Sequence, residues 1–180
     1  MKMLRYILFA LFIYQYSLAN ENILDQYPQS DLYSKPTEFI PGVFSAIGAT
    51  APPTYENSGH NNNLSFVVTS NGVVVINSGA SFRLAKAIHH EIKQVTDQPV
   101  KLVINENGQG HAMLGNSYWS RIGVDIIAHE DAILEVEENA YQILERMKSY
   151  NKEKAVGTTV VPANISFSDK YLLTILLLNN

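Results

Sequence analysis

Polar side chains that could do chemistry gather in one short segment of the chain, directly after an apolar run. The segment extends from Asn105 to Asn116, and its polar side chains include Glu106, Asn107, Gln109 and His111. Amide groups and one imidazole can bind a polar small molecule through directed hydrogen bonds. If the chain turns with positive φ at Gly108 and Gly110, the neighbouring side chains point into one cleft. The alternative is a loop whose amides satisfy only its own backbone.

A metal-free hydrolase would need a nucleophile and a base within reach of each other. Ser78, Ser81 and His111 are suitable residue types, but no Gly-x-Ser-x-Gly elbow occurs, so a serine-based mechanism is disfavoured. The pair His89-His90 is expected on the solvent face of a helix. His129 follows an apolar run, where it could either support a site or be a hydrogen-bonded core histidine.

The composition excludes several classes of function. The 180 residues fit one domain, and a hydrophobic share of 46% is typical of a packed globular core. No cysteine is present, which rules out disulfides, thiolate chemistry and cysteine metal sites. The formal net charge is −4 without a basic cluster, so nothing supports binding to nucleic acid or to an anionic membrane surface.

Residues 1–19 have the layout of a secretory signal peptide, with a basic start, an apolar run and a small-x-Ala end. Cleavage after Ala19 is expected. An uncleaved anchor is the alternative, but the apolar run is shorter than the roughly 20 residues that span a bilayer. Residues 20–41 are expected to form an N-terminal arm and residues 42–180 one domain. The mature protein is expected to be exported, periplasmic or secreted, without a stable membrane span.

Hydrophobic periodicity predicts a hairpin followed by alternating strands and helices. Strands are expected at 43–47, 64–68, 73–76, 101–104 and 124–128, and Asn71-Gly72 is a strong hairpin signal. Helices are expected after Ser81, near 117–121 and from Glu130 onward. A hairpin-like pair at 158–161 and 165–167 follows, and 171–178 is interpreted as a buried strand. This order is typical of a layered α/β or α+β architecture.

The order of elements resembles the N-terminal half of the metallo-β-lactamase-fold hydrolases. In that family a hairpin ends in a Val-Ile-Asp-x-Gly turn, a helix follows, and the next strand leads into the zinc-binding loop. Here Val75 to Gly79 reads Val-Ile-Asn-Ser-Gly. The family loop reads Asn-Thr-His-x-His-x-Asp-His-x-x-Gly-Asn, and Asn105 and Gly115-Asn116 match its ends without a gap. The resemblance implies an α+β fold, the first half of an αββα sandwich.

Within this resemblance, the departures lie where the family has its metal ligands. Asn107 and Gln109 stand at the first two histidines, His111 at the aspartate and Ala112 at the last histidine. Asn77 replaces the aspartate of the turn. The resemblance implies zinc, but neutral amides are poor zinc ligands and alanine supplies none.

An atypical metal site remains open as an alternative. His111 and Glu106 could provide a nitrogen and an oxygen, and His60 a third donor, because the family loop at that place borders the active cleft. The other interpretation is that His111 and Glu106 only form hydrogen bonds within their loop. The loop at 55–59 and Asn63 look most like exported members associated with quinoprotein or sulfur-compound metabolism.

Two functions therefore follow from the sequence. The first is an exported hydrolase-like protein with atypical or lost metal ligands, and the second is a non-catalytic binding or scaffold module derived from the same fold. The family's later ligands lie in a second half that would follow Asn180. A first half alone would expose the inner face of its sheet, so self-association is expected, with elution as a dimer or larger.

Overall fold

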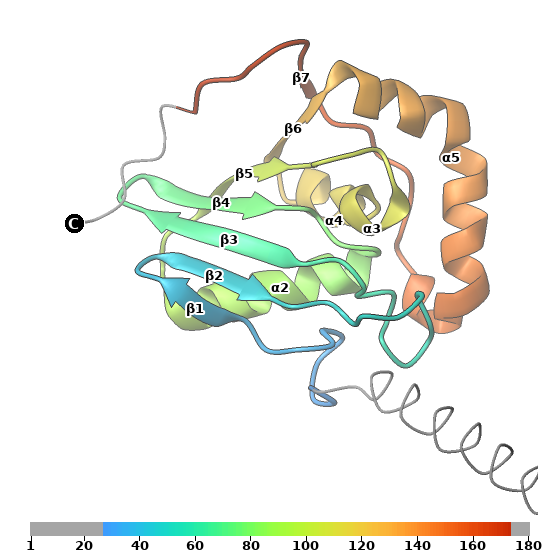
Figure 1. The fold of residues 1–180 in the computed structure, drawn as a ribbon, viewed down its shortest axis with the longest axis horizontal. Coiled ribbons are helices and arrows are strands. Elements are labelled where there is room, and N and C mark those ends of the chain that lie inside the picture. The colour runs from blue at the N-terminus through green and yellow to red at the C-terminus, as the bar shows by residue number, and fades with distance from the viewer. Residues whose placement is uncertain (1–26, 174–180) are drawn as a thin grey trace, which may run out of the picture.

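A mixed seven-stranded sheet forms the centre of the protein, in the order β1-β2-β3-β4-β5-β6-β7 (Figure 1). The structure is a computed structural model that describes residues 27–173. The strands are β1 (Thr37–Ile40), β2 (Val43–Ala46), β3 (Leu64–Thr69), β4 (Gly72–Ile76), β5 (Val100–Ile104), β6 (Asp125–His129) and β7 (Ile165–Phe167). The helices are α2 (Phe82–Val95), α3 (Gly110–Met113), α4 (Asn116–Arg121), α5 (Glu130–Asn151) and the 3₁₀ helix η2 (Lys152–Ala155).

The first four strands form an antiparallel meander, and the predicted hairpin joins β3 to β4 within it. Thr69 pairs with Gly72 in the register of β3 and β4, so the loop between them is Ser70-Asn71. Gly72 has φ of 135°, a conformation that strongly favours glycine. The hairpin prediction is confirmed, with the glycine as the first residue of β4 and not within the loop.

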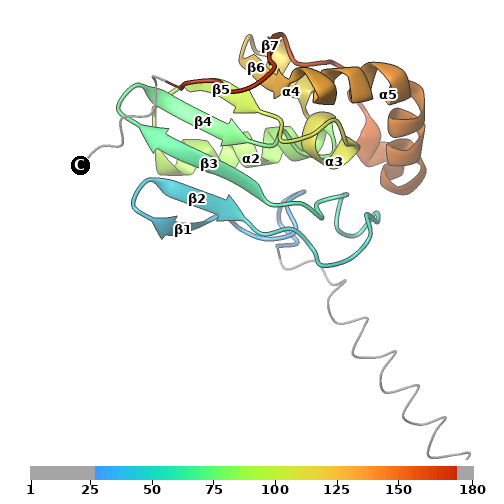
Figure 2. The same ribbon diagram turned by 45° about the horizontal axis from the view of Figure 1, so that its top comes forward.

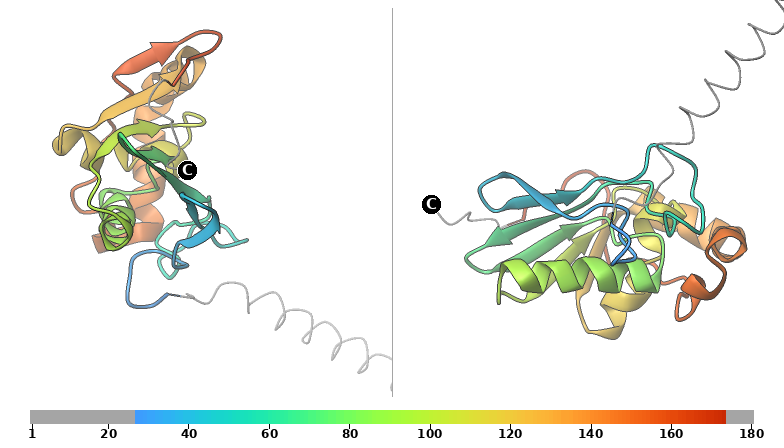
Figure 3. Two further views of the ribbon diagram at one scale, coloured as in Figure 1. Left: turned by 90° about the vertical axis from the view of Figure 1, so that its left-hand side faces the viewer. Right: turned by 90° about the horizontal axis from the view of Figure 1, so that it is seen from below.

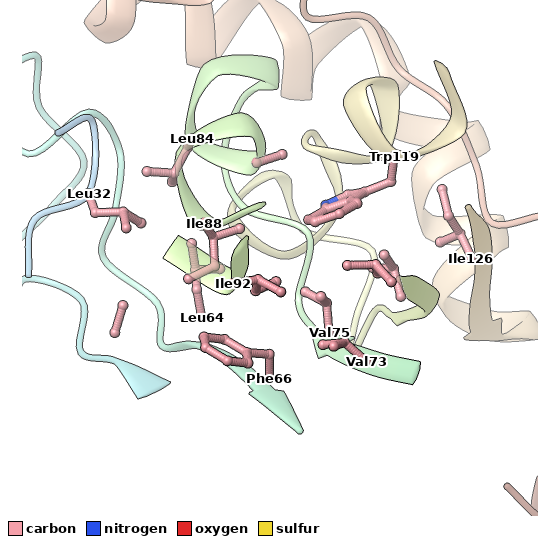
Figure 4. Close-up of a cluster of buried hydrophobic side chains, with 14 of the residues drawn as sticks. Leu32, Leu64, Phe66, Val73, Val75, Leu84, Ile88, Ile92, Trp119 and Ile126 are labelled. Atoms are coloured by element: carbon pink, nitrogen blue, oxygen red, sulfur yellow. The ribbon is translucent and has the colours of Figure 1, made fainter. Parts of the chain in front are cut away.

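The strands from β4 to β7 are parallel, and helices connect them. Ser81 caps α2 as predicted, because its Oγ accepts a hydrogen bond from the backbone N–H of Leu84 at 3.1 Å. α2 and α4 lie on one face of the sheet (Figure 3). The main core lies between these helices and the sheet, where Trp119, Phe66 and Ile88 are fully buried (Figure 4).

The opposite face of the sheet has its own apolar cluster. Val74, Leu102 and Ile127 are buried there, and Leu173 packs against them. After β7 the chain runs back alongside β5 (Figure 2), which brings this segment over the face. Part of the inner face is therefore covered by the chain itself, and self-association stays a prediction.

Two parts of the sequence prediction were wrong at the edges of the fold. The arm assigned to residues 20–41 contains β1, which pairs with β2, and Leu32, which is fully buried in the main core. The predicted hairpin at 158–161 does not form, because β7 pairs in parallel with β6. Local patterns could not reveal the burial of Leu32 or the pairing of β7, since both depend on partners distant in sequence.

The ends of the chain lie largely outside the described residues. The signal peptide at 1–19 and most of the predicted strand at 171–178 are among the positions that the structure does not describe. The described residues 171–173 form no strand, and Leu172 is 84% exposed. Between residues 27 and 173, no helix has the length and apolar character needed to cross a membrane.

Gly115 lies so close to the backbone of Ser78 that one added methyl group is expected to have a large effect. A Cβ on Gly115 would overlap the carbonyl group of Ser78, and Gly115 N–H also donates to Gly79 O at 2.7 Å. We expect Gly115→Ala to lower the free energy of unfolding by about 3 kcal/mol or more in urea denaturation, because backbone must move. Gly123→Ala is the control, because Gly123 has a φ of 77° and an added Cβ would meet no atom within 4 Å. This change should lower the free energy of unfolding by about 1 kcal/mol. Equal losses for the two variants would contradict this account.

Candidate functional site

The candidate site lies where β4 and β5 end, at the same edge of the parallel sheet (Figure 1). Ligands of open α/β sheets generally bind outside the carboxyl ends of the strands. Two segments meet here, the turn 77–79 after β4 and the loop 105–116 after β5. Asn77 has φ of 64°, which asparagine tolerates better than most residues, and its Oδ1 accepts a hydrogen bond from Glu106 N–H at 3.2 Å. The structure therefore brings Asn77 and Glu106 together.

A buried hydrogen-bond network closes the loop at its two ends. Asn105 Nδ2 donates to Asn116 Oδ1 at 3.0 Å, and Asn116 Nδ2 donates to Asn105 Oδ1 at 2.8 Å. The carbonyl oxygen of Ala112 accepts from Ser78 N–H at 2.8 Å, Ser78 Oγ at 2.9 Å and Asn105 Nδ2 at 2.9 Å. These bonds fix the loop through residues that are not metal donors. Ser78 is occupied in this network, which also argues against its use as a nucleophile.

Between these ends, the loop forms an Asx turn and the short helix α3. Asn107 Oδ1 accepts from Gln109 N–H at 2.9 Å, so this amide serves its own loop. Gly108 and Gly110 are not among the residues with positive φ, and the prediction on this point was wrong. Gly108 is needed for close approach, because a Cβ there would lie 2.5 Å from Ala132 O and 2.8 Å from Glu135 Cβ. The glycine lets the loop contact α5.

A cavity of about 620 Å³ lies between this loop and α5. One wall is the face of α5 that carries Glu135, Asn139, Gln142, Ile143, Arg146, Met147 and Tyr150, and the other parts include Gln109, Gly110, His111, Asn61 and Pro53. Sequence reasoning missed the α5 wall. The signal was present, because polar residues at 135, 139, 142 and 146 recur with helical spacing beside the apolar stripe.

His111 is half-buried at this cavity, near two carboxylates. Burial lowers the pKa of its imidazole below the ordinary 6.5, and the charges of Glu106 and Glu135 oppose that shift without outweighing it. The imidazole is therefore mostly neutral at pH 7, with one nitrogen as donor and one as acceptor. Glu135 also accepts a hydrogen bond from Gly108 N–H at 3.2 Å, which ties the helix to the loop.

His60 does not join the other candidates. It is buried within the loop 53–62, and its Nδ1 accepts a hydrogen bond from Tyr33 N–H at 2.9 Å. It is absent from the lining of the cavity, although its neighbour Asn61 belongs to that lining. Burial lowers the pKa of His60 to about 4. Its role in the described structure is to anchor the segment around Tyr33.

The other histidines have structural partners. His129 Nδ1 accepts from Asp131 N–H at 3.2 Å and caps α5, which neither sequence interpretation foresaw. His89 was expected in solvent, but it is half-buried, lies beside Trp119 and shares a 2.6 Å hydrogen bond with Tyr118 Oη. His90 is exposed as expected.

The donors present at this loop do not fit a zinc site. Zinc takes three or four nitrogen, sulfur or carboxylate ligands in a tetrahedral arrangement. Within residues 27–173, no three His, Asp or Glu side chains are placed to hold a metal ion together. His111 offers one imidazole, Ala112 offers no side-chain donor, and Glu106 Oε1 already accepts from Asn62 Nδ2 at 3.1 Å.

Comparisons with known proteins place this geometry in a known fold. No family model and no curated protein matches the sequence. A metallo-β-lactamase from Pontibacter korlensis matches 78% of this chain with a TM-score of 0.56 and 18% identity. The DIM-1 metallo-β-lactamase exposed to ceftazidime matches the same share with a TM-score of 0.56 and 11% identity. The chain has the metallo-β-lactamase fold.

The chain spans about half the length of these structures, since the match covers 55% of each of them. The sequence prediction of an α+β, first-half metallo-β-lactamase fold is thus confirmed. Identities of this size establish the fold alone, and one fold hosts many functions. The chemistry of this site therefore depends on its own residues.

The depressed pKa of His60 predicts pH-dependent stability. The unfolded imidazole binds a proton near its ordinary 6.5 and the folded one only near 4, so stability falls as pH decreases through this window. The loss should reach about 3 kcal/mol at the lower end. His60→Asn, whose Oδ1 can still accept from Tyr33 N–H, should flatten that slope in urea unfolding measured from pH 7 to 4. His90→Asn should leave the slope unchanged, and a steep slope retained in His60→Asn would refute the assignment.

Proposed function

We propose that this protein is a hydrolase-like member of the metallo-β-lactamase fold that binds a small polar molecule in the cleft between the loop 105–116 and α5, without zinc catalysis from this loop. The observation that carries the proposal is the lining of the cavity. Amides of Gln109, Asn139 and Gln142 surround a mostly neutral imidazole, and these groups form directed hydrogen bonds. A cavity of about 620 Å³ is within the range that holds small ligands.

The hydrogen-bond network supports binding without metal. The ends of the loop are fixed by Asn105, Asn116 and the Ala112 carbonyl group, and its centre is fixed to α5 through Gly108 and Glu135. A preorganised wall loses less conformational entropy when a ligand binds. At the positions of the family's histidines, Asn107 and Ala112 provide no zinc ligand, and Gln109 lines the cavity with an amide suited to hydrogen bonding.

A hydrolase with atypical metal ligation is the second candidate, and one observation favours it. His111 lies close enough to Glu106 and Glu135 for both charges to act on its pKa, so one imidazole and two carboxylates share one region. The matched structures are named metallo-β-lactamases, and this name implies a bound metal. A metal such as zinc is therefore supported here by resemblance only. A metal bound there would acidify water for hydrolysis.

Zinc binding separates the two candidates. We expect purified protein, equilibrated with zinc and dialysed, to retain far less than one zinc per chain in metal analysis, and His111→Ala to retain the same amount. His90→Ala serves as the control, since His90 is an exposed histidine away from the cleft. Stoichiometric zinc that is lost in His111→Ala and kept in His90→Ala would favour the atypical hydrolase and reject the metal-free binding site.

The start of the sequence supports export as part of the same proposal. Its basic lead, apolar run and small-x-Ala end are the features that signal peptidase substrates share. In a bacterial host, expression of the full sequence should release a mature chain that begins at Asn20, as read from intact mass and N-terminal sequencing. Replacement of Ala19 by a bulky residue such as tyrosine should block that processing. A full-length chain that keeps Met1 in the cytoplasm would reject export.

A further inference from the structure

The cleft carries opposite charges at its two ends. On the described α5 wall the formally charged residues are Glu135 and Arg146, eleven positions apart on one face of the helix. Eleven residues rise about 16 Å along an α-helix. Between them lie the amides of Asn139 and Gln142. The wall is therefore acidic at one end, neutral and hydrogen-bonding in the middle, and basic at the other end.

The basic end has an arginine without a counter-ion. Among residues 27–173, Arg146 forms no ion pair, and the adjacent acid, Glu145, is paired with Lys148 at 2.8 Å. Tyr150 lies one turn further along α5 and also lines the cavity. Burial raises the pKa of Tyr150 to about 12, and the charge of Arg146 only partly opposes this, so the phenol stays an O–H donor. A guanidinium beside a phenol is suited to a carboxylate.

The acidic end is held in place by the loop. Glu135 accepts from Gly108 N–H at 3.2 Å, and His111 and Gln109 lie on the opposite wall. One carboxylate beside a neutral imidazole favours a ligand that brings a positive charge and hydrogen-bond donors, such as an ammonium group.

The middle of the wall suits peptide groups. Asn139 Nδ2 donates to Glu135 O at 2.9 Å, which leaves its Oδ1 as an acceptor. Gln142 offers both a donor and an acceptor, and Ile143 and Met147 supply apolar contacts on the same wall. An amide group with a small side chain satisfies both kinds of surface.

We propose that the ligand of this cleft is a short peptide with free termini, its ammonium group at Glu135 and its carboxylate at Arg146 and Tyr150. This inference rests on the proposed binding function and names its ligand class. An extended chain spans at most about 3.3–3.6 Å per residue, so four residues span at most about 14 Å. With a charge-assisted contact of about 3 Å at its ends, such a peptide matches the separation of about 16 Å between the charged residues. A single amino acid would reach one end and leave the other unpaired.

The test uses four versions of one peptide: tetra-alanine with free termini, with an acetylated amine, with an amidated carboxylate, and with both caps. Binding is measured by calorimetry and by NMR shifts of the cleft residues. Free tetra-alanine should bind at least about tenfold more tightly than the amidated peptide and than the acetylated peptide, because each cap removes one charged contact.

Two variants assign the charges to their ends. Arg146→Gln should weaken binding of the free peptide and remove its advantage over the amidated peptide, while the penalty of acetylation stays. Glu135→Gln, which keeps an acceptor for Gly108 N–H, should remove the penalty of acetylation and leave that of amidation. Lys148→Gln is the matched control, because Lys148 is an exposed cation of α5 outside the cavity lining. It should bind all four peptides like the unmodified protein.

The outcomes separate this inference from the function on which it rests. If the doubly capped peptide binds as tightly as the free one and Arg146→Gln changes nothing, the cleft binds small molecules but the charged-end assignment is overturned. If no peptide binds while neutral sugars or amides shift the cleft signals, the peptide class is overturned and the binding function stands. If none of these probes shifts the signals of Gln109, His111 or Asn139, both are rejected.

Discussion

The reciprocal amide pair of Asn105 and Asn116 is the interaction on which the site depends. The two side chains exchange hydrogen bonds at 3.0 and 2.8 Å, and both residues are buried. Each bond contributes only about 1 kcal/mol net, but an amide left unsatisfied in this environment would cost about 1–3 kcal/mol. The pair joins the end of β5 to the start of α4, so the intervening loop has a fixed span whatever residues it contains.

In this arrangement, the residues that hold the loop in position are not the residues that could do chemistry. Asn116 Nδ2 also donates to Val161 O at 2.9 Å, which extends the network to the segment before β7. Gly115 and the carbonyl groups of Ser78 and Gly79 bring the turn after β4 into contact with it. None of these groups is a metal donor. Residues 106 to 111 can therefore differ from a zinc-binding loop without loss of the surrounding structure.

The sequence predicted the parts of the fold that have local signals. The β3–β4 hairpin, the Ser81 cap of α2 and the start of α5 at Glu130 were correct because turn, capping and periodic patterns determine them within a few residues. β1 was missed because its four residues are all exposed, so they carry no alternation of buried and exposed side chains. The segment 165–167 was predicted as extended but given the wrong partner, because β7 pairs with β6, which is distant in sequence. The family resemblance located the loop, since its first and last residues are the ones that form the amide pair.

The composition of the site was harder to predict, because more than half of the residues that line the cavity come from α5. A sequence places Glu135 and Arg146 on one helical face but cannot say which loop that face meets. The deciding feature is Gly108, where even a methyl group would collide with Ala132 O. The glycine was interpreted as a source of positive φ, whereas its physical role is to allow close packing of loop against helix. This contact turns the amphipathic helix into a wall of the cleft, and it makes the charges of α5 part of the site.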